Sequence, residues 1–240
     1  MPRIRHRPLF LIALAVLWPE ALHAEPSGSP ASILKKGQWV MGLGGGSLVK
    51  REMKGNAEAT AYNVGHYRGY GLTDRLSLYG KIGAAYLEVD DATIIKASDP
   101  SATNDFGLNV LSSGQVKYKI FEDANQTWEW DGSLQYVDIR KRHTGKNEAQ
   151  WHEWAFATSV ARAFGRIKPY LGVKYSVVDF QYKIRENGQL LQQGHYKEDG
   201  PVGVFFGTDA YFGEEEDVLI NVESTYLNGA EVDVAIAYTF

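Results

Sequence analysis

The sequence predicts an all-β protein, a transmembrane antiparallel up-and-down β-barrel of about ten strands. Three observations carry this prediction: an aromatic and glycine-rich composition, repeated segments of alternating polarity, and connections that are alternately short and long. The 240 residues include 14 Tyr, 6 Trp, 10 Phe and 25 Gly, which favours strands over helices. A mean hydropathy of −0.30 argues against a bundle of membrane-spanning helices, each of which needs ~20 mostly apolar residues.

Composition also removes several functional classes. The absence of cysteine excludes disulfides, thiolate metal sites and cysteine nucleophiles. A net charge of −4 and a pI of about 5.9 give no basic face of the kind that binds nucleic acid. No cofactor motif is present, so we expect no cofactor.

The first residues have the pattern of a secretory signal peptide. Arg3, Arg5 and Arg7 precede an apolar run over 9–18, and Ala24 provides a small residue at the expected cleavage position. The run is too short to cross a membrane as a helix. We therefore expect a signal peptide over 1–24, a periplasmic segment over 25–36 and a barrel over 37–240.

The remaining chain divides into segments of strand character. The expected strands are 37–49, 58–72, 75–89, 104–120, 126–141, 149–164, 167–183, 196–212, 217–227 and 230–240. Connections after even-numbered strands are compact, and those after odd-numbered strands are mostly longer, including a loop over 185–194. Short periplasmic turns and longer outer loops are typical of transmembrane barrels, and an even strand count places both ends on the periplasmic side.

Alternation assigns each strand a lipid face and an inner face. A charge near the middle of the lipid face costs ~2–4 kcal/mol for Arg or Lys, so charged residues are expected inside. On the fourth strand, Phe106 is expected to face lipid. The second strand has no consistent apolar face, because His66 and Arg68 share a face with apolar residues. This predicts a bulge or a change of face in that strand. The tryptophans are expected in two interfacial girdles, with Trp39, Trp128 and Trp130 at the periplasmic end and Trp151 and Trp154 at the outer end.

The inward charges form the expected lumen network. Its members are Lys81, Lys117, Lys174, Glu129, Asp131, Asp209, Glu223 and Asp233. Eight-stranded barrels are filled by side chains whereas sixteen-stranded porins hold water, so a barrel of about ten strands is expected to be filled. A narrow channel for small solutes is the alternative, favoured by the small inward residues Gly42, Gly44, Gly46, Gly83 and Ala85.

The C-terminal residues carry a family resemblance. Apolar residues alternate from Val232 to Phe240, and this ending resembles the last strand of bacterial outer-membrane β-barrels. The resemblance implies that Phe240, Tyr238 and Ile236 form a signal read by the barrel-assembly machinery, and that the protein lies in the cell outer membrane.

A second resemblance lies in one hairpin. Residues 70–83 read YGLTDRLSLYGKIG, which is similar to a hairpin of small outer-membrane barrels of the OmpA-like, OmpX-like and opacity-protein types. Those families most often have eight strands, so eight is the alternative strand count. The resemblance implies fold and location, and says little about activity.

Enzyme motifs are weak, and we predict that the protein is not an enzyme. His152 and Glu153 begin like a zincin motif, but Phe156 stands where the second metal-binding imidazole would be. An outer-membrane hydrolase with a site at the extracellular rim remains an alternative. Its candidate acids and imidazoles are Asp90, Asp91, His152, Asp179 and His195.

Two basic groups mark the expected outer loops. One contains Lys141, Arg142, His143 and Lys146, and the other contains Lys50, Arg51 and Lys54. Lipopolysaccharide phosphate is the natural anionic neighbour of such charges, with Lys141, Arg142 and Lys146 as the candidate contacts. The sequence therefore predicts a monomeric barrel with a structural or surface-interaction role, whose partners are outer-membrane lipid, lipopolysaccharide and the assembly machinery.

Overall fold

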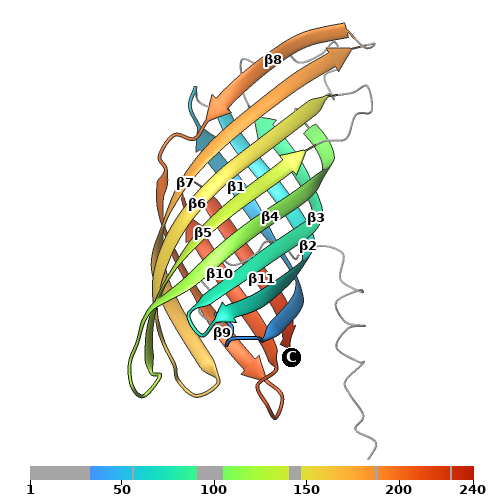
Figure 1. Cartoon of the computed structure of the whole chain (residues 1–240). Coiled ribbons are helices and arrows are strands. Elements are labelled where there is room, and N and C mark those ends of the chain that lie inside the picture. The colour runs from blue at the N-terminus through green and yellow to red at the C-terminus, as the bar shows by residue number, and fades with distance from the viewer. Residues whose placement is uncertain (1–32, 56, 91–104, 141–146, 187–188, 228) are drawn as a thin grey trace, which may run out of the picture.

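The computed structural model describes residues 33–55, 57–90, 105–140, 147–186, 189–227 and 229–240. These residues form strands inclined to a common axis (Figure 1). Within the described ranges, no helix is long and apolar enough to cross a membrane. The strands are β1 (Trp39–Met53), β2 (Ala57–Thr73), β3 (Leu76–Asp90), β4 (Asp105–Glu122), β5 (Trp128–Arg140), β6 (Glu148–Arg162), β7 (Ile167–Glu186), β8 (Gln189–Lys197), β9 (Val202–Phe212), β10 (Val218–Tyr226) and β11 (Ala230–Thr239).

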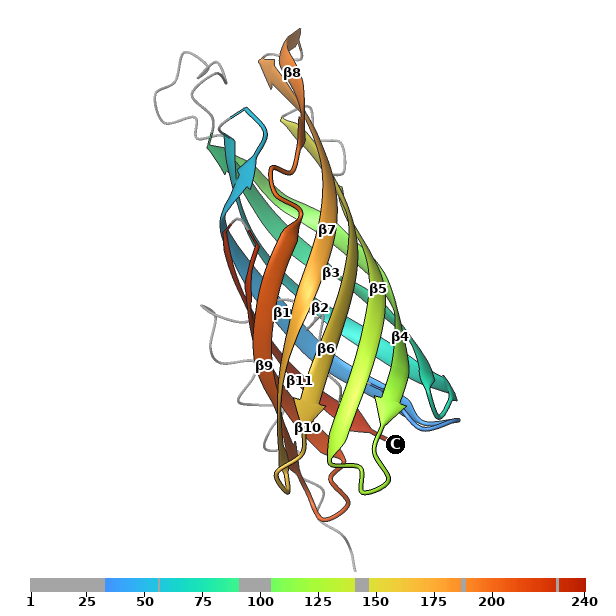
Figure 2. The same cartoon turned by 90° about the vertical axis from the view of Figure 1, so that its left-hand side faces the viewer.

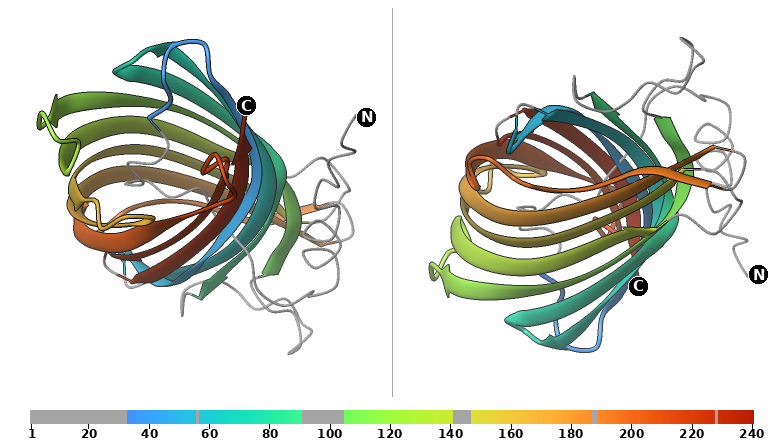
Figure 3. Two further views of the ribbon diagram at one scale, coloured as in Figure 1. Left: turned by 90° about the horizontal axis from the view of Figure 1, so that it is seen from below. Right: turned by 90° about the horizontal axis from the view of Figure 1, so that it is seen from above.

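The strands close into an antiparallel barrel, which confirms the predicted fold class. Each strand from β1 to β7 pairs with the next, β7 pairs with β9, and β11 pairs with β1 over ten residue pairs from Val40↔Thr239 to Val49↔Ala230. The end-on views show the resulting ring (Figure 3). Since β8 and β9 occupy one position beside β7, the eleven strands fill ten positions, as the sequence predicted.

The shared position corrects the predicted loop over 185–194. β7 has 20 residues; its first part pairs with β9 through Tyr175, and its last part pairs with β8 from Asp179 onward. β8 therefore rises beyond the rest of the barrel, at the end opposite the C-terminus (Figure 2). These two ends are called the upper end and the lower end below.

The polarity of the wall reverses along the axis. Over the lower and middle parts, the outer surface is mostly apolar, with Ile82 66% exposed and Leu171 63% exposed, while charged side chains are buried inside. Near the upper end the order is opposite: Glu148, Gln150 and Gln181 lie on the outer face, and an apolar cluster fills the interior. The buried members of this upper core are Met53, Ala57, Ala59, Ala61, Ala85, Leu87, Val89, Phe106, Leu111, Ile139, Ala149, Trp151, Val178, Phe180, Tyr182 and Ile184.

Two local irregularities change which face a side chain occupies. Lys50 has a φ of 53°, and the pairing of β1 with β2 shifts register between Trp39 and Arg51. The extra residue turns Arg51 inward. Gly107 has a φ of 61° beside a register shift between β3 and β4, and it turns Phe106 into the upper core. The predicted lipid-facing position of Phe106 is therefore wrong, because a one-residue bulge inverts the alternation.

β2 is regular where a bulge was expected. Its pairing with β3 runs without a shift from Glu58 to Gly71, so the predicted bulge or change of face at His66 and Arg68 is wrong. Both residues lie on the outer surface, where Arg68 Nε donates a hydrogen bond to His66 Nε2 at 3.0 Å.

The predicted upper girdle is also partly wrong. Trp154 is 54% exposed on the outer surface, but Trp151 is buried in the interior. Two residues three positions apart on a regular strand occupy opposite faces. Trp39, Trp128 and Trp130 are all exposed toward the lower end.

Candidate functional site: a closed lumen

All eight residues of the expected lumen network lie inside the barrel. Each is buried, with an exposed fraction of 6% or less. They project from β3, β4, β5, β7, β9, β10 and β11, so the wall contributes charge around most of its circumference. The structure distributes them over three levels along the axis.

The lower level is organised around Glu129. Lys119 lies 3.7 Å from Glu129 and 3.0 Å from Glu122, and Lys168 also forms an ion pair with Glu129. Asp131, on the same strand face, accepts a hydrogen bond from Ser159 Oγ at 2.9 Å. Sequence reasoning named neither lysine, although Lys119 lies two residues from the inward-facing Lys117 and Lys168 two residues from the inward-facing Tyr170.

The middle level is a chain of hydrogen bonds among β7, β9 and β10. The Tyr170 hydroxyl donates to Glu223 at 2.9 Å. Asn221 Nδ2 donates to that hydroxyl at 2.9 Å and to Asp209 at 2.5 Å. Asp233 is opposite Glu223 in the pairing of β10 with β11. On the β3–β4 side, Lys81 donates to Asn63 at 3.1 Å and Lys117 Nζ lies 5.9 Å from the centre of the Tyr79 ring.

The upper level is an ion cluster centred on Arg51. Its guanidinium lies 3.2 Å from Glu153 and 2.6 Å from Glu198. Ser176 Oγ accepts from Arg51 at 2.8 Å and donates to Glu153 at 2.8 Å. Lys174 lies 3.2 Å from Glu231 and 3.8 Å from Glu153. The cluster thus joins β1, β6, β7, β11 and the segment between β8 and β9.

The Arg51 cluster corrects one predicted surface. Arg51 was expected beside Lys50 and Lys54 in an outer basic loop, but its side chain is 1% exposed. Lys50 remains outside, 3.5 Å from Glu58. Glu153 was available from alternation, because it directly precedes the outward-facing Trp154 and so lies on the opposite face. Glu198 lies beyond the end of β8 and carries no alternation signal.

Apolar clusters lie inside the barrel above and below the charges. Above the Arg51 cluster lies the upper core, where Phe180 stacks on Tyr196 at 6.3 Å between ring centres. Below, Leu34 is buried in a cluster with Val40 and Leu219. The Leu34 N–H donates to Ser77 Oγ at 2.9 Å and the Gly37 N–H to the Gly71 carbonyl at 2.9 Å, so residues 34–37 pack against the barrel.

The rim candidates for an enzyme lie on the outer face. His152 Nδ1 is 2.8 Å from Asp138 and 3.1 Å from the Tyr136 hydroxyl. His195 Nε2 is 2.8 Å from Asp179. Asp90 ends β3, and Asp91 lies outside the described residues. In the described part of the chain, no group of three His, Cys, Asp or Glu side chains can hold a metal ion.

The Asp179–His195 pair gives a pH-dependent expectation. Burial raises the pKa of Asp179, but hydrogen bonds from His195 and Gln181 outweigh it and leave this pKa below its ordinary value. The contribution of Asp179 to stability is therefore complete above its ordinary pKa of about 4 and is lost as pH falls through the lowered value. Unfolding titrations from acid to neutral pH should show wild type more stable than Asp179→Asn at neutral pH, with the difference vanishing in acid. A constant difference would contradict this assignment.

The remaining predicted residues are placed as follows. Tyr238 and Phe240 are exposed on the outer surface, with ring centres 6.2 Å apart. The N–H groups of Trp39 and Phe240 donate to each other's carbonyls at 3.0 and 2.9 Å, which extends the seam between β1 and β11. Ile236 lies opposite Leu43 in this pairing. Lys141, Arg142 and Lys146, and the signal segment 1–24, lie outside the described residues.

No protein-family model and no curated protein sequence matches the chain. Among solved structures, it is similar to the outer membrane protease OmpT of Escherichia coli, with 9% identity, 85% of this chain and 96% of that chain covered, and a TM-score of 0.46. It is also similar to the outer membrane protein OprG of Pseudomonas aeruginosa, with 11% identity, 86% of this chain and 97% of that chain covered, and a TM-score of 0.40. A third similar structure is Ail, the attachment invasion locus protein of Yersinia pestis, with 8% identity, 86% of this chain and 100% of that chain covered, and a TM-score of 0.38. At these identities no function carries over. The barrel has the general fold that the sequence resemblance implies, with ten positions around the ring.

Proposed function

We propose that this protein is an integral barrel of the bacterial outer membrane with a structural or surface-interaction role. The observation that carries the proposal is the polarity reversal of the wall. An apolar outer surface around a charged interior is stable only where the surroundings are lipid, since exposed apolar area in water is unfavourable at about 25 cal/mol per Å². Near the upper end, where the outer face is polar and the interior is apolar, the barrel is suited to aqueous surroundings.

The filled interior supports a non-conducting barrel. Three levels of buried charge lie between the upper core and the Leu34 cluster. Opening a path through the Arg51 cluster would separate Arg51 from Glu153 and Glu198, and leaving such charges unpaired in a buried site costs about 3–5 kcal/mol. A channel for small solutes would therefore require rearrangement of the cluster.

The outer Asp–His pairs do not favour an enzymatic role over a structural one. His152 and His195 each have a carboxylate neighbour on the barrel exterior. A nucleophilic mechanism also needs a positioned nucleophile and an oxyanion site. The contacts of the two Asp–His pairs include neither a positioned nucleophile nor an oxyanion site.

Planar-bilayer recording tests the closed lumen. Purified protein inserted into bilayers is expected to show no single-channel current, because the interior is occupied by paired side chains. Insertion must be shown separately by protease protection of the barrel in vesicles. Steps of stable conductance from inserted protein would refute the structural role in favour of the channel. Turnover of peptide or ester substrates, lost in His152→Ala, would instead support a hydrolase.

A further inference from the structure

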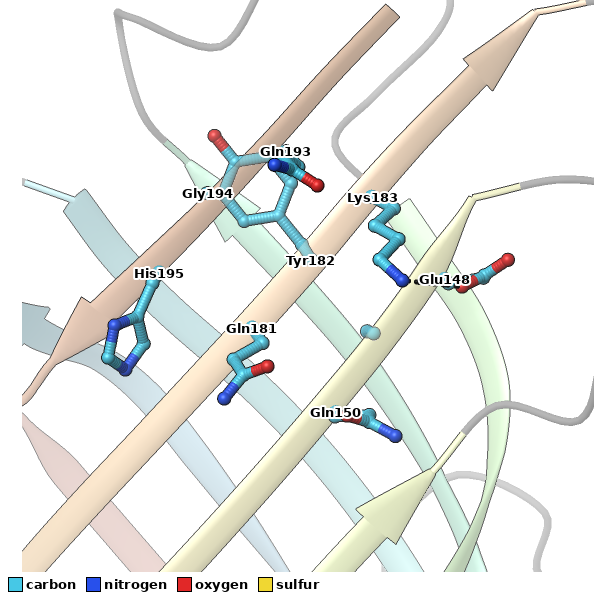
Figure 4. Close-up of a pocket in the computed structure, with 9 residues that line it drawn as sticks. Glu148, Gln150, Gln181, Tyr182, Lys183, Gln193, Gly194 and His195 are labelled. Carbon is cyan, nitrogen blue, oxygen red and sulfur yellow. Dashed lines mark ion pairs between the residues drawn. The ribbon is translucent and has the colours of Figure 1, made fainter. Parts of the chain in front are cut away.

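The outer face of the upper wall carries a groove of about 520 Å³, within the ~300–1,000 Å³ range of small-molecule sites. It spans β6, β7 and β8 and lies outside the barrel. Figure 4 shows its side chains coming from these three neighbouring strands. The groove is separate from the lumen and from the two outer Asp–His pairs, except that His195 lines its lower edge.

Strand register arranges the groove as two parallel rows. Gln150 is opposite Gln181, which is opposite His195. Two residues further from the middle of the barrel, Glu148 is opposite Lys183, which is opposite Gln193. Residues at the same level of adjacent strands are about 5 Å apart, so six side chains face one ligand-sized surface.

The chemistry of this surface is polar and nearly neutral. Glu148 lies 3.1 Å from Arg185 and 3.9 Å from Lys183, so its charge is compensated within the wall. His195 is held by Asp179 at 2.8 Å. What remains are the amides of Gln150 and Gln193, each of which offers donors and an acceptor, and part of the Gln181 amide. Gln181 keeps its carbonyl and one N–H, because its other N–H donates to Asp179 at 3.1 Å. Such a lining matches hydroxyl groups, which also donate and accept, better than it matches a charged ligand.

The height of the groove indicates where those hydroxyl groups come from. Trp154, opposite Val177, forms the last apolar row of β6 and β7 on this face, and His152, opposite Asp179 and Lys197, forms the next row. Successive rows are about 6.6 Å apart along a strand, or ~5 Å along the axis at a tilt of about 40°. The groove rows thus lie ~10 and ~15 Å above the apolar boundary, beyond the ~5–8 Å of a headgroup layer.

We infer that the groove binds the core sugars of lipopolysaccharide held in the outer leaflet. The inference rests on the proposed outer-membrane location, because only there does a sugar layer surround the barrel at this height. The charged row of His152, Asp179 and Lys197 lies at the level of the phosphorylated headgroup, and the amide rows lie at the level of the sugars above it.

Binding of defined glycolipids tests the inference. Folded protein in detergent is titrated with lipid A alone and with lipid A that carries its inner-core sugars. The sugar-bearing glycolipid is expected to bind about tenfold more tightly, since three hydrogen bonds of ordinary net strength give at least this factor. The variant Q150A/Q181A/Q193A should lose that difference while retaining its affinity for lipid A.

A comparison surface, one row closer to the apolar boundary, occupies the opposite wall. Glu58, Thr60 and Glu88 lie on the outer face of β2 and β3, one to two rows above Tyr62 and Tyr86. The variant E58A/T60A/E88A is expected to keep the sugar-dependent gain. Equal affinity of wild type for both lipids, or an unchanged gain in Q150A/Q181A/Q193A, would overturn the inference. Insertion into vesicles, measured in parallel by protease protection, shows whether the outer-membrane proposal itself has failed.

Discussion

Replacing Arg51 by alanine is expected to lower the free energy of unfolding by about 3–5 kcal/mol, because the change leaves buried carboxylates without their cation. The guanidinium lies between Glu153 and Glu198 at 3.2 and 2.6 Å. Lys174 cannot fully replace it, since that lysine is closer to Glu231 than to Glu153. Urea titration of the protein in lipid vesicles, followed by tryptophan fluorescence, measures the effect.

Two further variants separate the cluster from general effects of substitution. Lys50→Ala removes the neighbouring exposed cation, whose surface pair with Glu58 is worth at most about 1 kcal/mol. The triple variant R51M/E153Q/E198Q removes all three charges together and should recover most of the loss, because no ion remains buried alone. If Arg51→Ala lowers the free energy of unfolding no more than Lys50→Ala does, the Arg51 cluster does not stabilise the barrel.

Placing arginine at Val204 is expected to destabilise the barrel in a bilayer by about 2–4 kcal/mol. Val204 is 52% exposed and lies opposite Val173 of β7 and Tyr226 of β10, within the apolar outer surface. An arginine there must place its charge in hydrocarbon or distort the lipid around it. Folding into vesicles, followed by unfolding in urea, measures the penalty.

Thr60→Arg supplies the comparison for Val204→Arg. Thr60 lies on the outer face of β2, one row above Tyr62 and opposite Glu88, where the surroundings are aqueous in the proposed orientation. Its substitution is expected to cost no more than about 1 kcal/mol, the value near the membrane interface. Equal stabilities of the two variants would contradict the assignment of the apolar surface to lipid.

Alternation in the sequence was sufficient wherever a strand is regular. Glu129 and Asp131 could be placed inside, and Trp128 and Trp130 outside, because side chains two residues apart share a face. The same rule placed Asp209 and Glu223 in the lumen. It was misapplied at Trp151, whose spacing from Trp154 already required the opposite face. It was also wrongly abandoned at His66 and Arg68, where β2 is regular.

Irregular pairing set the limit of that reasoning. The bulge at Lys50 turns Arg51 into the lumen, and the one at Gly107 turns Phe106 into the upper core. A bulge depends on how two strands meet, so neither strand's own sequence displays it. For the same reason residues 185–194 were expected as a loop, although β7 extends far enough for Gln189–Lys197 to pair with it.

The sequence by itself determined the barrel class, the number of positions around the ring and the burial of the eight lumen charges. The segments and the turns between them indicate the first two, and the period of two within single strands gives the third. Only the tertiary structure decided which charges meet. The Arg51 cluster joins residues up to 147 positions apart, and the glutamine groove depends on the register of three strands. Such contacts are set by barrel closure and by one-residue shifts in pairing, each of which exchanges the inner face of a strand for its outer face.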